Sequence, residues 1–221
     1  MRPRPTPDRR ARCASLPLAL LAVALALGAC TAMPPTHFHS LMPDEVAPRT
    51  GAAARPAATL AIVLEPVRVP AQADQPQWVV RLADGSLAVL EQERWASALP
   101  DEFRAALLEE LIVGHGAIDA RTQPAPATPP WRIAIDVRRF DSVPGREARI
   151  EGSWLIQGSG ASRAVASRCE WLLREPATAS MTALAAAHRR AIARLADAVA
   201  LVLARVARGE APGCPALDER R

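Results

Sequence analysis

Cys30 is the residue whose type and setting most clearly indicate a chemical reaction. It follows an apolar run from Leu16 to Leu27 and then two small residues, Gly28 and Ala29. A thiol at this position can be acylated, and small residues before it suit a peptidase with a narrow pocket. The apolar run is about a dozen residues long, shorter than the roughly 20 that a membrane-spanning helix needs.

The surroundings of Cys30 indicate a processed lipoprotein. Five arginines and one acid precede the apolar run, as in a secretory signal. The sequence resembles a bacterial lipobox, in which the thiol is diacylated and the signal is cut between Ala29 and Cys30. A plain secretory signal would end in an A-x-A pattern, and an uncleaved anchor is disfavoured by the short core with Pro17 and Gly28. We expect a signal peptide at 1–29, a lipidated tether at 30–35, a folded domain at 36–214 and a tail at 215–221.

Charge and cysteine content change once the signal is removed. The whole chain has a net charge of +4, but residues 1–29 contain five of the 27 basic and one of the 23 acidic residues, so 22 of each remain. A neutral body gives no support to nucleic-acid binding. Two cysteines follow Cys30, and an exported chain reaches an oxidising compartment, so we expect Cys169 and Cys214 to pair. The alternative is two free thiols.

Two histidines on one strand face provide the minimum for a metal site. His37 and His39 are two residues apart, but zinc needs a third or fourth ligand. Neither His115 nor His188 has a recognisable ligand spacing. We therefore interpret His37 and His39 as strand residues, and His188, on the apolar stripe of the last helix, as a core or boundary residue.

Catalytic motifs are not found. Gly158-Ser159-Gly160 lies between two predicted strands and not at the strand-to-helix turn of a nucleophile elbow. Asp101 and Glu102 are interpreted as surface charges that favour the helix dipole. Trp131, Trp154 and Trp171 have the inward parity of their strands, which indicates a core role. We expect no enzyme activity, no cofactor and no metal.

The periodicities predict a mixed α/β domain. Apolar residues alternate with polar ones in three runs near 131–138, 148–156 and 165–171, which predicts an antiparallel meander. Residues 37–41, 59–69, 77–82 and 86–92 predict further strands, the last two around the Asp84-Gly85 hairpin signal. Helices are predicted from Pro100 to Gly114 and from about Ala177 to Arg208. We expect a single α/β sandwich domain, with one mixed, largely antiparallel sheet and packed helices.

An ordered set of motifs resembles a known family. "THFHSL", "LEPVRVPAQADQPQWVVR" and "ERWASAL" are followed by "WRIAIDVRRFD" and "ARIEGSWLI". This order is similar to that of the PqiC (YmbA-like) lipoproteins, which are auxiliary subunits of ABC-type or MCE-type transport systems. The chain departs from the family in having no tyrosine, and in Ser97-Ala98 where the family often has Glu-Pro.

The resemblance implies a fold, a location and partners. The fold would be a small α/β sandwich distantly similar to the amino-terminal domain of TolB. The protein would be lipid-anchored at the periplasmic face of the outer membrane, and Thr31, which is not Asp, argues against inner-membrane retention. Its partners would be an MCE-domain protein and an inner-membrane permease of a lipid transport system, and it could form a homo-oligomeric ring. Its role would be to bind these partners and support envelope integrity.

A contact surface is expected on the loop from Pro70 to Gln77 with Trp78 and Arg81, and at Arg94 and Trp95. Loops carry function on rigid scaffolds, and Trp and Arg dominate interface energies. The alternative is that both tryptophans fill the core. Two other functions stay open: an envelope scaffold or assembly lipoprotein without a role in lipid transport, and a periplasmic enzyme, which would need a convergent polar pocket.

Overall fold

The computed structural model describes residues 34–45, 60–122, 129–159 and 164–217. The chain divides into two units, residues 1–35 and Thr36–Arg221, and the second is the folded domain considered below. The predicted signal peptide and Cys30 lie outside the described residues. No helix among the described residues is long and apolar enough to cross a membrane.

A five-stranded sheet forms the larger part of the domain, in the order β5-β2-β6-β7-β8. Strands β6, β7 and β8 are an antiparallel meander, which confirms the strand pattern predicted from the sequence. Strand β2 runs parallel to both of its neighbours, β5 and β6. The bounds are β2 Ala61–Leu64, β5 Ile118–Asp119, β6 Trp131–Val143, β7 Glu147–Gly158 and β8 Val165–Pro176.

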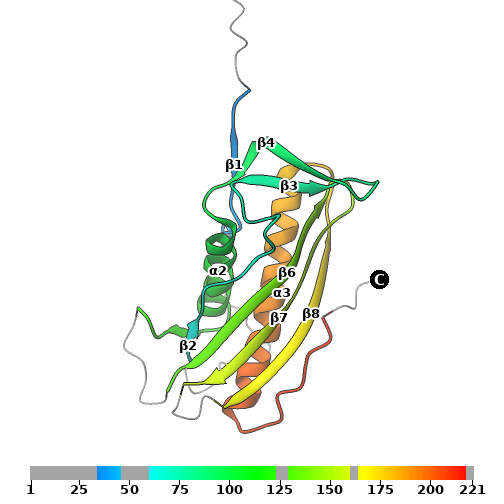
Figure 1. The fold of residues 1–221 in the computed structure, drawn as a ribbon. Helices are drawn as coiled ribbons and strands as arrows, with labels where there is room; N and C mark the ends of the chain where they lie inside the picture. The colour runs from blue at the N-terminus through cyan, green and yellow to red at the C-terminus, as the bar shows by residue number, and fades with distance from the viewer. Residues whose placement is uncertain (1–33, 46–59, 123–128, 160–163, 218–221) are drawn as a thin grey trace, which may run out of the picture. The chain divides into compact units, whose positions relative to one another are not determined.

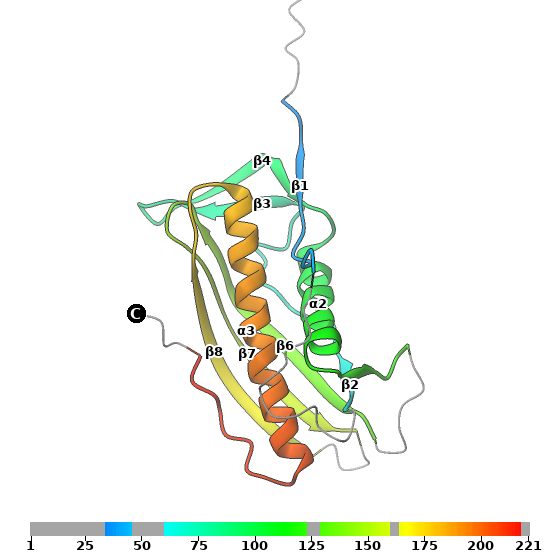
Figure 2. The same cartoon turned by 180° about the vertical axis from the view of Figure 1, so that it is seen from behind.

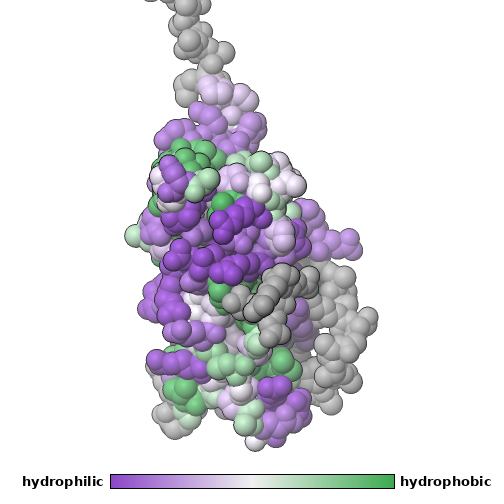
Figure 3. Space-filling view, turned by 90° about the vertical axis from the view of Figure 1, so that its right-hand side faces the viewer, coloured by the Kyte–Doolittle hydropathy of each residue, from purple (hydrophilic) through white to green (hydrophobic). Residues whose placement is uncertain are grey.

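A second sheet of three strands has the order β1-β4-β3, with β1 at His37–His39, β3 at Gln77–Arg81 and β4 at Leu87–Trp95. Strands β3 and β4 form the predicted hairpin, and β1 pairs with β4 in parallel. The sequence predicted one sheet, and the structure has two. The hairpin pairs with the amino-terminal strand and not with the meander. This pairing joins residues distant in the sequence, so local periodicity could not predict it. Hydrophobic side chains appear at this upper end of the domain in Figure 3.

Two long helical segments cover one face of the five-stranded sheet (Figures 1 and 2). Helix α2, Leu99–Glu109, continues into a π-helical turn, Glu110–Gly114, and α3 spans Met181–Ala207. The side chain of Ser180 caps α3 by accepting a hydrogen bond from the backbone N–H of Ala183. The sequence placed this helix start near Ala177; the cap fixes it four residues later.

Gly152 of β7 allows β6 and a side chain of β8 to approach closely. A Cβ added there would lie 2.2 Å from the carbonyl oxygen of Asp136 and 2.6 Å from the indole of Trp171. Backbone of β6 and a buried ring of β8 therefore occupy the space that any side chain would need. Trp154 and Trp171 are buried as predicted, and Trp131 is half-buried at the rim of the core.

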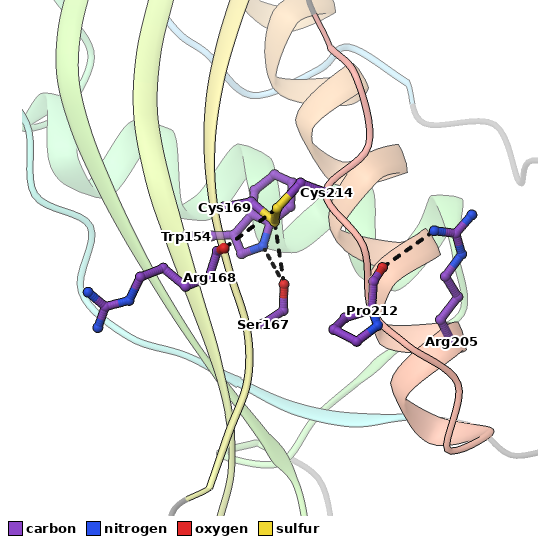
Figure 4. The surroundings of a disulfide bond; sticks show 7 residues. All are labelled: Trp154, Ser167, Arg168, Cys169, Arg205, Pro212 and Cys214. Atoms are coloured by element: carbon purple, nitrogen blue, oxygen red, sulfur yellow. Dashed lines mark hydrogen bonds between the residues drawn. A yellow bond between two sulfur atoms is a disulfide. The ribbon is translucent and has the colours of Figure 1, made fainter.

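A disulfide joins Cys169 of β8 to Cys214 of the carboxy-terminal segment. The Cys169 side is buried, while Cys214 is exposed. Figure 4 shows Trp154 and Ser167 beside the bond, where the indole N–H of Trp154 donates to the Ser167 hydroxyl at 3.3 Å. The bond holds the segment after α3 against the outer edge strand of the five-stranded sheet.

Candidate functional site

A pocket of about 320 Å³ lies between two segments that are distant in the sequence. One wall is formed by residues 74–76 and the other by residues 96–98, with Trp95 also in the lining. Two backbone hydrogen bonds set this geometry: the Trp95 N–H donates to the carbonyl of Pro76 at 3.0 Å, and the Ala96 N–H to that of His39 at 2.8 Å. The loop predicted for partner contact therefore supplies half of the pocket.

The second wall was missed by the sequence analysis. Ala96, Ser97 and Ala98 are exposed and have small side chains, so they leave room at the surface. The available signal was Ser97-Ala98 itself, the place where the chain departs from the family pattern. Small residues in a loop between a strand and a helix leave space at the surface, but their sequence does not indicate what binds there.

Trp78 and Trp95 lie in the core, which corrects the expectation that their side chains contact a partner. Their exposed fractions are 1% and 4%, and their rings pack at a centroid distance of 4.1 Å. His39 adds an edge-to-face contact to Trp78 at 5.0 Å. All three side chains point to the inner face of the three-stranded sheet, and burial of large aromatic surface stabilises that arrangement. The alternative that both tryptophans fill the core is the arrangement in the structure.

The two predicted cations are held away from the pocket. Arg81 donates to the Asp141 carboxylate at 2.9 Å and to the Gly85 carbonyl at 3.0 Å. Burial alone would raise the pKa of Asp141, but hydrogen bonds from Arg81 and Arg139 outweigh it and lower that pKa. The hydrogen bond to Asp141 also raises the pKa of Arg81. Arg81 is therefore a structural cation.

Arg94 lies on the outer face of the three-stranded sheet, paired in register with Phe38 of β1 and Gln77 of β3. Its Nε donates a long hydrogen bond of 3.5 Å to the carbonyl of Glu91. It does not line the pocket.

Glu102 joins the pocket wall to the amino-terminal strand. One carboxylate oxygen accepts from the Ser40 hydroxyl at 2.7 Å and the Leu41 N–H at 2.8 Å, and the other accepts from the Ser97 hydroxyl at 2.9 Å. The side chain is buried, so its interpretation as a helix-surface charge was wrong. A buried carboxylate with three donors is a fixed organiser of its surroundings.

His188 is part of a buried polar chain behind the tryptophans. The indole N–H of Trp78 donates to the Ser142 hydroxyl at 2.7 Å, and that oxygen lies 2.8 Å from Nε2 of His188. The imidazole stacks on Phe140 at 4.0 Å, and its Nδ1 has no partner among the described residues. Burial lowers the pKa of His188 to about 3. The prediction of a core histidine is confirmed.

His37 and His39 converge on a carboxylate. His37 Nδ1 lies 3.0 Å and His39 Nε2 2.5 Å from the two oxygens of Glu93. Burial would raise the pKa of Glu93, but the hydrogen bonds from the two histidines lower it. Among the residues that the structure describes, no group of three or more potential ligands is arranged to hold a metal. The three side chains tie β1 to β4.

Comparison with known proteins finds a matching family and solved structures with a similar fold. The model of the family described as "ABC-type transport auxiliary lipoprotein component" matches residues 41–200. A crystal structure of a Xanthomonas campestris protein is 22% identical, with a TM-score of 0.57 over 76% of this chain and 94% of that one. Another crystal structure, of an uncharacterized protein, is 16% identical, with a TM-score of 0.56 over 76% and 97%. These structures share the fold. No match is found among curated proteins.

Proposed function

The chain belongs to the family of ABC-type transport auxiliary lipoprotein components, and from that premise we propose that it is the outer-membrane-anchored, binding subunit of a lipid transport system. The observation that carries the proposal is the family match over most of the folded domain, on a chain whose amino terminus resembles a lipobox. Binding and not catalysis is proposed because the polar groups near the site, Glu102 and His188, are buried and satisfy structural roles.

The anchor in this proposal is the acylated Cys30. Each buried CH₂ contributes roughly 0.8 kcal/mol, and two or more chains give stable membrane attachment where one is marginal. Cys30→Ser should give unprocessed or soluble periplasmic protein in fractionation and mass spectrometry. Cys13→Ser is the matched control, because Cys13 would leave with the signal. Normal processing and outer-membrane recovery of Cys30→Ser would refute the anchor.

The proposed partner contact is the pocket between residues 74–76 and 96–98. Its volume suits one large side chain of a partner, the kind of anchor that dominates interfaces when it fills a pocket. The partners proposed from the family resemblance are an MCE-domain protein and an inner-membrane permease, and several copies of this chain would form a ring around the conduit.

Ala96→Arg tests this contact, because the long cationic side chain would occupy the pocket from an exposed position. We expect strongly reduced in vivo crosslinking to the MCE-type partner with unchanged thermal unfolding. Ala207→Arg is the control: Ala207 is also exposed, at the end of α3, where a cation is favourable. Equal crosslinking in both variants would refute the pocket as the contact.

An envelope scaffold or assembly role without lipid transport is the alternative. Crosslinking of the wild-type protein distinguishes the two. Recovery of neither an MCE-type protein nor a permease, with unchanged detergent permeability after deletion of the gene, would contradict the transport role.

A further inference from the structure

The three-stranded sheet has an outer face on which apolar side chains are exposed beside Arg94 and Gln77. Its inner face carries the buried Trp78 and Trp95, and side chains of opposite parity point outward. On that outer face, Phe38, Leu87 and Val89 are 66%, 45% and 46% exposed. Val79 of β3 lies directly opposite Val89 in the register. These four residues are called the outer sheet face below. In Figure 3, the upper end of the domain shows hydrophobic residues among hydrophilic ones.

Three of the seven exposed large hydrophobic side chains among the described residues lie on this one face. An open face of an antiparallel sheet is normally polar. The outer face of the five-stranded sheet follows that rule, with ion pairs between Arg138 and Glu170 at 2.9 Å and between Arg68 and Asp136 at 3.2 Å. Exposed apolar residues clustered on one small face indicate a site of interaction.

The chain length before β1 limits how far that strand can lie from Cys30. Strand β1 begins at His37, seven residues after Cys30. Seven fully extended residues span about 25 Å at most. If Cys30 carries acyl chains, His37 stays within that distance of the lipid, and Phe38 of the outer sheet face is the next residue.

We propose that the outer sheet face rests on the interfacial layer of the membrane that holds the anchor, with Phe38, Leu87 and Val89 in contact with lipid. The proposal rests on the lipid anchor of the proposed function. Aromatic and aliphatic side chains partition into this layer, and an arginine beside them reaches the headgroups. Arg94, paired in register with Phe38, is in that position.

The charges near the face predict which lipids matter. Arg81 is paired with the buried Asp141, and the other two charges, Arg94 and Glu91 of β4, have opposite signs. Apolar burial and not attraction to anionic lipid then drives the contact, so it should persist in zwitterionic vesicles and in high salt.

The test places an environment-sensitive fluorophore on the mature, acylated protein reconstituted in phosphatidylcholine vesicles. Leu87→Cys and Leu201→Cys are matched sites, with native side chains that are 45% and 42% exposed on different elements. Each introduced thiol is uniquely reactive, because Cys30 would be acylated and Cys169 is bonded to Cys214. We expect at least twofold stronger quenching of the probe at 87 than at 201 by lipids that carry a shallow quencher.

Three outcomes would overturn the proposal. The first is equal quenching at the two sites, and the second is full access of an aqueous quencher to the probe at 87. The third is a probe signal at 87 that depends on the protein density in the vesicles and not on the lipid quencher. That result would assign the face to contact with a second copy of the chain. Mass spectrometry of the same sample separates this failure from failure of the anchor. Acylated protein with an unquenched probe refutes only the membrane contact, and protein without acyl chains refutes the proposed function.

Discussion

His188→Phe should make the protein less sensitive to acid. The imidazole of His188 is fully buried and stacked on Phe140, so phenylalanine preserves the aromatic packing while removing the titratable group. Burial lowers the pKa of His188 from 6.5 to about 3. Between these values the unfolded chain binds a proton that the folded chain does not, so the stability is intact above about pH 6.5 and falls as the pH drops towards 3.

The magnitude follows from the two pKa values. Each pH unit in that window costs about 1.4 kcal/mol, so the free energy of unfolding should fall by about 2 kcal/mol between pH 7 and pH 5 through His188 alone. The variant also loses the contact between His188 and Ser142, a loss of about 1 kcal/mol that does not depend on pH. The difference between the two pH values therefore isolates the titration.

Urea unfolding followed by tryptophan fluorescence at pH 7 and pH 5 measures this difference. Wild type should lose about 2 kcal/mol more than His188→Phe on acidification. Ser142→Ala is a second variant: it removes the hydrogen-bond partner of His188 but leaves the imidazole buried, so it should keep the wild-type acid sensitivity. Equal losses in wild type and His188→Phe would refute burial as the cause.

Three further changes test the packing. Gly152→Ala should lower the free energy of unfolding by about 3 kcal/mol or more, because the added methyl meets the Asp136 carbonyl; an unchanged melting temperature would contradict this. Glu102→Ala should cost about 3 kcal/mol in urea unfolding through three lost hydrogen bonds, whereas a loss below 1 kcal/mol would show that water replaces them. Cys214→Ser should cost about 4 kcal/mol for a separation of 45 residues from Cys169; native protein with both thiols open to alkylation would refute the bond.

Local periodicity predicted the parts of the fold in which burial alternates regularly. Ile133 and Ile135 of β6 are buried, and they alternate with the half-buried Arg132 and Ala134. The strands of the meander were predicted from alternation of this kind. The last helix was predicted from its apolar stripe, and its true start depends on the Ser180 cap. These features are readable because each depends on residues within a few positions of one another.

The remaining features depend on long-range pairings. The parallel pairing of β1 with β4 joins residues more than fifty positions apart, so two sheets were not predicted. Trp78 lies in the run "QWVVR", where valines follow on both faces, and its direction was undecided until the partner strand was known. Glu102 follows Asp101 in a helix first turn, and its burial depends on Ser40 and Ser97. The candidate pocket is missed for the same reason, because its two walls meet only in the fold.

The hydrogen bonds that Glu102 accepts from Ser40 and Leu41 have a mechanical consequence. A force applied through the amino-terminal tether reaches the domain at β1, a strand of three residues that would resist little by itself. The hydrogen bonds of Glu102 are made to the two residues that follow that strand in the sequence, so they would transmit the load to α2 and the core. How long the domain survives a sustained pull is set by its unfolding rate. With the proposed anchor in one membrane and the proposed partner in another, the Glu102 carboxylate would carry the load between the tether and the folded domain.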